Sequence, residues 1–143
     1  MQVPDVNVLV YAYREDVPDH RLFNSWLREA MSAPGAFGVV DLILSGFLRV
    51  VTHPRVFDPP SPVAHAMGFA DAVRSAPNAV SLSPGPRHWE IFSDLCTRSR
   101  AKGNLIPDAF IAALAIETGS ELVTTDRDFA RFPGLRLLHP FAE

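Results

Sequence analysis

Three aspartates stand where this chain could gather carboxylates into one site. Asp5 interrupts the apolar run from Val3 to Val10, Asp108 begins an apolar helical segment, and Asp126 directly follows a short apolar segment. A carboxylate such as Asp5 is costly to bury unless it is paired or bound to a cation. If the three converge, a hard divalent cation offsets their mutual repulsion, and oxygen-only ligation selects Mg²⁺ or Mn²⁺. The chemistry implied is phosphodiester hydrolysis by a metal-bound water.

The same aspartates also have a structural interpretation. A helix N-terminus stabilises a carboxylate, so Asp108 could simply begin its helix. Asp126 and Asp128 could be caps or surface turn residues. Spacing alone therefore leaves a metal site and a set of caps both open.

Other catalytic chemistries have weaker support in the sequence. The five histidines lack the close spacing of zinc ligands, and the single cysteine, Cys96, excludes a multi-cysteine zinc site or an internal disulfide. No serine lies in a nucleophile-elbow pattern, and no glycine-rich phosphate loop is present. Trp89, Phe92 and Leu95 recur at helical spacing, which we interpret as core and not as a base-stacking platform.

Short apolar segments alternate with helical patterns along the chain. Strands are expected within 1–6, 36–40, 79–82, 121–125 and 135–139, and helices over 7–13, 18–31, 41–52, 62–75, 86–102, 107–118 and, briefly, 128–132. This alternation predicts an α/β sandwich around a mostly parallel sheet. In such folds sites lie beyond the carboxyl ends of strands, which is where Asp5 and Asp126 fall.

Length and charge limit the class of protein. The 143 residues suit one domain, and 48% apolar content with a net charge of −3 argues against a disordered chain or a polybasic coat for nucleic acid. No apolar stretch is long enough to cross a membrane and no leader pattern is present, so we expect a cytoplasmic protein. Twelve of the 13 basic residues are arginine, which suits phosphate contact.

Four segments in order resemble the PIN-domain ribonucleases, and specifically the VapC toxins of VapBC toxin–antitoxin pairs. They are residues 5–12, 46–57, 103–109 and 122–135. The stretch 51–57 is similar to a branch of the family that is abundant in mycobacteria. The resemblance spans essentially the whole chain and implies one PIN domain over residues 1–143. Its fold would be a PIN-like three-layer α/β/α sandwich with a central, mostly parallel sheet.

The resemblance also implies roles for individual residues. Asp5 and Asp108 match the principal metal ligands, and Asp126 matches a further acid that helps to hold metal or water. Thr124 matches a hydroxyl that supports the site by hydrogen bonding, and Asn7 a polar residue that orients the first aspartate. Asp128 matches a frequent additional acid, either near the site or capping the next turn. The implied catalytic set is Asp5, Asp108, Asp126, Asn7, Thr124 and Asp128.

One position departs from the family pattern. Gly46 stands where the family usually has a glutamate before an aromatic residue, so the site retains three acids. Three acids could still bind one Mg²⁺, which disfavours a second metal but leaves the metal count open. Asp41 is the nearest acid, and it could compensate or could cap the helix 41–52. Arg49 lies on about the same helix face as Gly46 and is a candidate phosphate contact. Arg98 and Arg100 are further candidates, with a solvated helix end as the alternative.

The function implied by the resemblance is that of a toxin in a type II toxin–antitoxin system. It would be an endoribonuclease dependent on Mg²⁺ or Mn²⁺, with tRNA or rRNA as substrate. The chain is expected to form a homodimer and to bind a VapB-type antitoxin in a toxin–antitoxin hetero-oligomer. No association with a membrane is expected. The alternative, suggested by Gly46, is a PIN-fold module that binds RNA or antitoxin without cleaving.

Overall fold

Strands and helices alternate along the chain in a computed structural model that describes residues 1–141. The strands are β1 (Gln2–Pro4), β2 (Phe37–Val40), β3 (Ala79–Leu82), β4 (Glu121–Val123) and β5 (Arg136–Leu138). The helices are α1 (Val6–Tyr13), α2 (His20–Ser32), α3 (Asp41–Val51), α4 (Val63–Arg74), α5 (His88–Ser99) and α6 (Leu105–Thr118), with a 3₁₀ turn, η1 (Arg127–Arg131).

The five strands form one parallel sheet in the order β3-β2-β1-β4-β5. The chain adds β2 and β3 on one side of β1 and then crosses to place β4 and β5 on the other side. The order therefore reverses at β1, and the crevice beyond the carboxyl ends of β1 and β4 is where ligands bind in such sheets. Pro4 and Val123 are paired at these ends, so the residues that follow the two strands emerge side by side.

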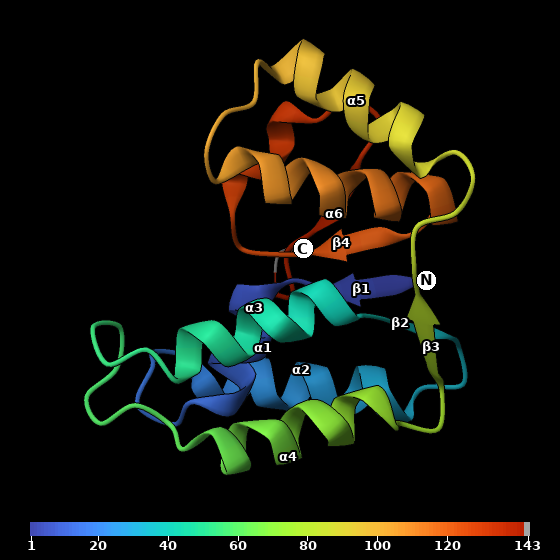
Figure 1. The fold of residues 1–143 in the computed structure, drawn as a ribbon. Helices are drawn as coiled ribbons and strands as arrows, with labels where there is room; N and C mark the ends of the chain where they lie inside the picture. The colour runs from blue at the N-terminus through green and yellow to red at the C-terminus, as the bar shows by residue number, and fades with distance from the viewer. Residues whose placement is uncertain (142–143) are drawn as a thin grey trace.

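Helices flank the sheet on two sides. Figure 1 shows α5 and α6 next to β4, with β1 and the group α1 to α4 beyond it. This arrangement is the predicted α/β/α sandwich. The central strands are buried between these layers, with all four residues of β2 buried, whereas the edge strands β3 and β5 are partly exposed.

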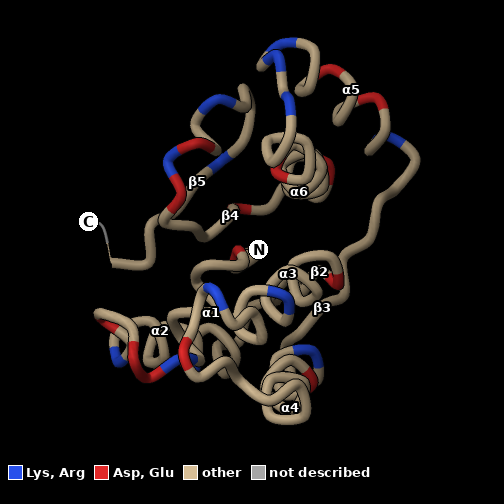
Figure 2. The backbone as a smooth tube through the Cα atoms, turned by 60° about the vertical axis from the view of Figure 1, so that its left-hand side comes forward, with Lys and Arg blue, Asp and Glu red and all other residues tan. Residues whose placement is uncertain are grey.

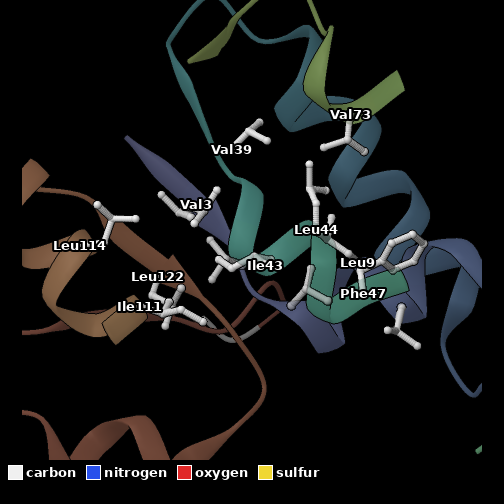
Figure 3. Close-up of a cluster of buried hydrophobic side chains, with 14 of the residues drawn as sticks. Val3, Leu9, Val39, Ile43, Leu44, Phe47, Val73, Ile111, Leu114 and Leu122 are labelled. Carbon is white, nitrogen blue, oxygen red and sulfur yellow. The ribbon is translucent and has the colours of Figure 1, made fainter. Parts of the chain in front are cut away.

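The core forms where helices from both layers meet the central strands. Figure 3 shows Ile111 and Leu114 of α6 with Leu122 of β4 on one side of Val3, and Ile43 and Phe47 of α3 on the other side. Helix α6 buries residues around most of its circumference, which explains why its sequence is apolar on nearly every face.

Several predicted boundaries and one core assignment were wrong. Helix α6 begins at Leu105, before Pro107, because proline is tolerated in a first turn where its missing N–H has no helical partner. Strand β4 ends at Val123, which leaves Thr124 and Thr125 in the following loop. Trp89 is 71% exposed, since α5 packs on α6 at the outside of the fold and buries only a narrow stripe.

Candidate active site

A cavity of about 600 Å³ opens at the crevice beyond β1 and β4. Its lining brings together the three predicted acids from different elements: Asp5 follows β1, Asp108 lies in the first turn of α6, and Asp126 follows β4. Helix α3 forms another wall. The convergence that sequence spacing suggested is therefore present in the fold.

Asp5 is held firmly at the junction of β1 and α1. Its backbone N–H donates to the Val123 carbonyl at 2.9 Å, and the residue is only 5% exposed. The Thr124 hydroxyl donates to Asp5 Oδ2 at 2.8 Å and accepts from the Asp126 N–H at 3.0 Å. The loop after β4 thus connects Asp5 and Asp126 through one hydroxyl. Supporting the site by hydrogen bonding is the role that the resemblance implies for Thr124.

Electrostatics at the cavity disfavour additional negative charge. Burial raises the pKa of Asp5, although hydrogen bonds from the Val6 N–H and the Thr124 hydroxyl partly oppose the shift. Burial raises the pKa of Asp108 to about 6, and the charges of Asp5, Asp126 and Asp128 add to the effect. No ion pair within residues 1–141 involves any of these carboxylates. A bound cation would relieve this repulsion.

The donor set fits a hydrated divalent cation. Within residues 1–141 no three acidic, histidine or cysteine side chains form a closed metal cage. Mg²⁺ needs none, because it keeps several waters and takes one or two carboxylates from the protein. Asn7 also lines the cavity, and its Oδ1 is buried without a hydrogen-bond partner among the described residues. This oxygen is a further hard donor at the cavity. The candidate ligands are the three carboxylates of the lining, Asp5, Asp108 and Asp126.

Two expected contacts near these ligands differ from the prediction. No hydrogen bond joins Asn7 to Asp5 in the described part of the chain, so Asn7 does not orient that carboxylate directly. Asp126 Oδ1 accepts from the Asp128 N–H at 2.9 Å, which makes Asp126 the cap of η1 in place of Asp128. Asp128 does not line the cavity and acts on Asp108 through its charge.

Asp41 does not compensate for the missing acid. Its carboxylate is exposed and accepts from Arg74 of α4 at 3.0 Å, and it is absent from the cavity lining. Five residues turn a helix by roughly 140°, which carries position 41 away from the face of position 46. Val40 is the N-cap of α3, and Asp41 is its first helical residue, so the predicted cap was also one residue off.

The three predicted arginines are in different settings. Arg49 lines the cavity from α3, whereas neither Arg98 nor Arg100 does. Arg98 pairs with Asp94 one turn earlier in α5, at 3.2 Å. Direct contact with a phosphate in this cavity is therefore supported only for Arg49.

The sequence reasoning missed two polar residues of the lining, Ser45 and Asn104. Ser45 lies four residues before Arg49, so the same helical spacing that selected Arg49 would have selected it. Asn104 belongs to the segment before Asp108 that carried the family resemblance, and it is the N-cap of α6.

Comparison with known proteins gives a consistent result. A PIN domain family model matches residues 3–135. Ribonuclease VapC25 of Mycobacterium tuberculosis is 43% identical over 136 residues, which cover 95% of this chain and 96% of that protein. Ribonuclease VapC33 of the same species is 35% identical over 143 residues and covers both chains completely.

Solved structures share the fold at much lower identity. VapBC2 from Rickettsia felis, bound to a DNA fragment from its promoter, has a TM-score of 0.67 at 20% identity and covers 96% of each chain. VapBC-1 from nontypeable Haemophilus influenzae has a TM-score of 0.68 at 13% identity, covering 99% of this chain and 98% of that one. Within residues 1–141 no helix is long and apolar enough to cross a membrane.

Proposed function

The chain belongs to the PIN-domain family, and from this premise we propose that it is a metal-dependent endoribonuclease, the toxin of a type II toxin–antitoxin pair. One observation carries the proposal: three carboxylates that form no ion pair within residues 1–141 line one cavity at the point where the strand order reverses. The related proteins VapC25 and VapC33 are ribonucleases, which supports the same chemistry for this chain.

Asp5, Asp108 and Asp126 would hold Mg²⁺ or Mn²⁺. When bound, the cation lowers the pKa of a coordinated water and stabilises charge that develops on phosphate. Thr124 keeps the Asp5 carboxylate in place, since its hydroxyl donates to that carboxylate from a buried position. Asp108 must release its proton before it can ligate, and its raised pKa favours ligation at neutral or higher pH.

We further propose a VapB-type antitoxin as the partner, with the toxin assembling as a homodimer and as a hetero-oligomer. The solved structures of similar fold include VapBC2 from Rickettsia felis and VapBC-1 from Haemophilus influenzae. Structured RNA such as tRNA or rRNA is the proposed substrate. Light scattering tests the assembly. It is measured on the chain alone and on the chain co-expressed with the product of the neighbouring gene, and a monomer under both conditions contradicts the proposal.

A non-cleaving module is the competing function. Gly46 favours it, because the α3 wall lacks a carboxylate. The three converging acids count against an RNA-binding module, since carboxylates without a bound cation repel the phosphates of RNA.

The deciding experiment is cleavage of total RNA by antitoxin-free protein. We expect cleavage with Mg²⁺ or Mn²⁺, none with EDTA, and none by an Asp108→Asn variant that retains the native circular dichroism spectrum. Cleavage that persists in EDTA would refute the metal role. A wild-type protein that binds antitoxin and RNA but never cleaves would establish the binding module instead.

A further inference from the structure

One face of helix α3 forms a wall of the cavity that carries no acid. Its lining residues are Leu42, Ser45, Gly46 and Arg49, spaced as one stripe of a helix. Figure 2 shows most of the α3 backbone in tan, because the helix contains only one acidic and one basic residue, Asp41 and Arg49. Asp41 is outside the cavity lining, which leaves Arg49 as the wall's only charge.

Close packing between α1 and α3 keeps this wall without an acid. A Cβ atom added at Gly46 would lie 2.9 Å from Val6 Cγ2, which is closer than real Cβ contacts. Val6 is the first residue of α1, directly after Asp5, and a β-branched side chain in a helix has essentially one χ1 rotamer. An acidic side chain at position 46 therefore requires Val6 or the two helices to shift, and Val6→Ala removes the closest contact.

Arg49 is available for a ligand. No ion pair within residues 1–141 includes it, although Arg14, Arg74 and Arg98 all have carboxylate partners. A guanidinium presents paired N–H donors that match the oxygens of a phosphate. The charges also balance: one divalent cation and Arg49 together neutralise the three carboxylates.

Resting on the nuclease function proposed above, we propose that the cavity has two dissimilar walls. The carboxylates of Asp5, Asp108 and Asp126 hold a single divalent cation, and Arg49 binds a nonbridging oxygen of the RNA phosphate from the α3 side. Arg49 is thus a substrate-binding residue on the wall where an additional carboxylate would recruit a second cation.

The first test counts cations without any RNA. Calorimetric titration of the apoprotein with Mn²⁺ should give one site per chain. The double variant Val6→Ala with Gly46→Glu should gain a second site, whereas its matched control, Val6→Ala with Gly46→Gln, should not. Two sites in the wild type, or no gain from the added glutamate in a variant with native circular dichroism, would overturn the single-cation assignment.

The second test separates phosphate contact from metal binding. Arg49→Ala should raise KM for RNA by about 10-fold or more, the effect of losing a charged hydrogen bond, and should not weaken Mn²⁺ binding. Arg49→Lys should recover part of the loss, because it keeps the charge but not the paired geometry. An unchanged KM, with unchanged anisotropy of a fluorescent RNA hairpin in Ca²⁺, would remove Arg49 from the site.

These tests distinguish the inference from the function on which it depends. The Mn²⁺ count needs no catalysis, so it stands or falls even if the protein cleaves nothing. A wild type that cleaves RNA with two bound Mn²⁺ would refute this inference and leave the proposed nuclease intact. A protein that neither cleaves nor binds RNA would refute the nuclease and, with it, the role of Arg49.

Discussion

The two ends of helix α1 each carry a charged residue, and the two charges are treated in opposite ways. At the C-terminal end, Arg14 donates to both Asp16 oxygens at 2.8 and 2.6 Å, to the Pro59 carbonyl at 3.1 Å and to Ser61 Oγ at 3.0 Å. Its guanidinium also lies 4.2 Å above the Phe57 ring. At the N-terminal end, Asp5 is buried beside other acids and has no ion-pair partner among the described residues.

This difference separates a charge that supports the fold from one that serves a ligand. Arg14 connects α1 to the segment before α4, and each contact lowers the free energy of the folded chain. Asp5 lowers stability by being ionised where it stands, since burial and the charge of Asp126 raise its pKa and the hydrogen bonds from Val6 and Thr124 only partly oppose the shift. Uncompensated charge of this kind is retained where function requires it.

The largest expected effect tests Asp5 as the functional end. Asp5→Asn should lower RNA cleavage by about 100-fold or more, because it removes the negative charge of a ligand that would hold the cation at the reacting phosphate. The free energy of unfolding should not fall, since an asparagine oxygen still accepts from the Thr124 hydroxyl. Cleavage assays and urea denaturation measure the two quantities. Asp94→Asn on the outside of α5 is the control, and equal cleavage by both variants would end the distinction.

Arg14 should show the reverse pattern. Arg14→Ala is expected to reduce the free energy of unfolding by about 2 kcal/mol, through the loss of several hydrogen bonds and of packing on Phe57. Mn²⁺ binding should remain unchanged. Urea denaturation and calorimetry provide the readouts, with the exposed Arg21→Ala in α2 as the matched control. A stability equal to that of the control would show that the Arg14 contacts are incidental.

The pH dependence of Asp108 sharpens the contrast within the site. A carboxyl whose pKa is raised to about 6 in the folded chain binds more protons than in the unfolded chain, so it destabilises the apoprotein as pH rises from about 4 to above 6. Asp108→Asn should therefore raise the free energy of unfolding above pH 6 by about 1 kcal/mol, allowing for partial solvent screening, and should have no effect below pH 4.

The Asp108 prediction is checked by denaturation in EDTA over this pH range. Saturating Mg²⁺ should reverse the order, because the cation stabilises only the chain that binds it. A wild type that is more stable than the variant in EDTA at pH 8 would contradict the uncompensated charge.

The smallest effect is expected at Asp41. Its pair with Arg74 is exposed on both sides, where solvent screens the attraction, so the pair contributes little to stability. Asp41→Asn should leave cleavage unchanged and alter the unfolding free energy no more than Arg74→Ala does. Loss of cleavage in Asp41→Asn alone would place Asp41 in the active site and overturn the assignment of the α3 wall.

The acids at the sheet edge could be predicted from sequence because two simple rules act there. An apolar segment followed by Asp5, and another followed by Asp126, predicted two strand ends, and parallel strands bring such ends to one edge. Thr124 was assigned a role by the family resemblance, and its place directly after β4 puts its hydroxyl between Asp5 and Asp126. These features depend on chain order and strand direction, which a sequence displays.

The parts that sequence could not predict depend on packing between elements. The contact of Val6 with Gly46 arises from how α1 lies against α3, and no spacing within either segment reveals it. Trp89 has the helical spacing of a core residue, but spacing does not tell how wide a stripe an outer helix buries. For Asp41 the sequence left a site acid and a helix cap both open, because its contact with Arg74, 33 residues away, depends on how α3 packs on α4.

The central position of β1 has a consequence for the order of synthesis. Asp5 emerges from the ribosome early, but the hydroxyl that fixes it belongs to Thr124, 119 residues later. Strand β4, which accepts the Asp5 N–H and precedes Asp126, is also absent until residues 121–126 have been synthesised. A nascent chain released before that point therefore lacks the proposed active site and would leave the RNA of the cell that makes it intact.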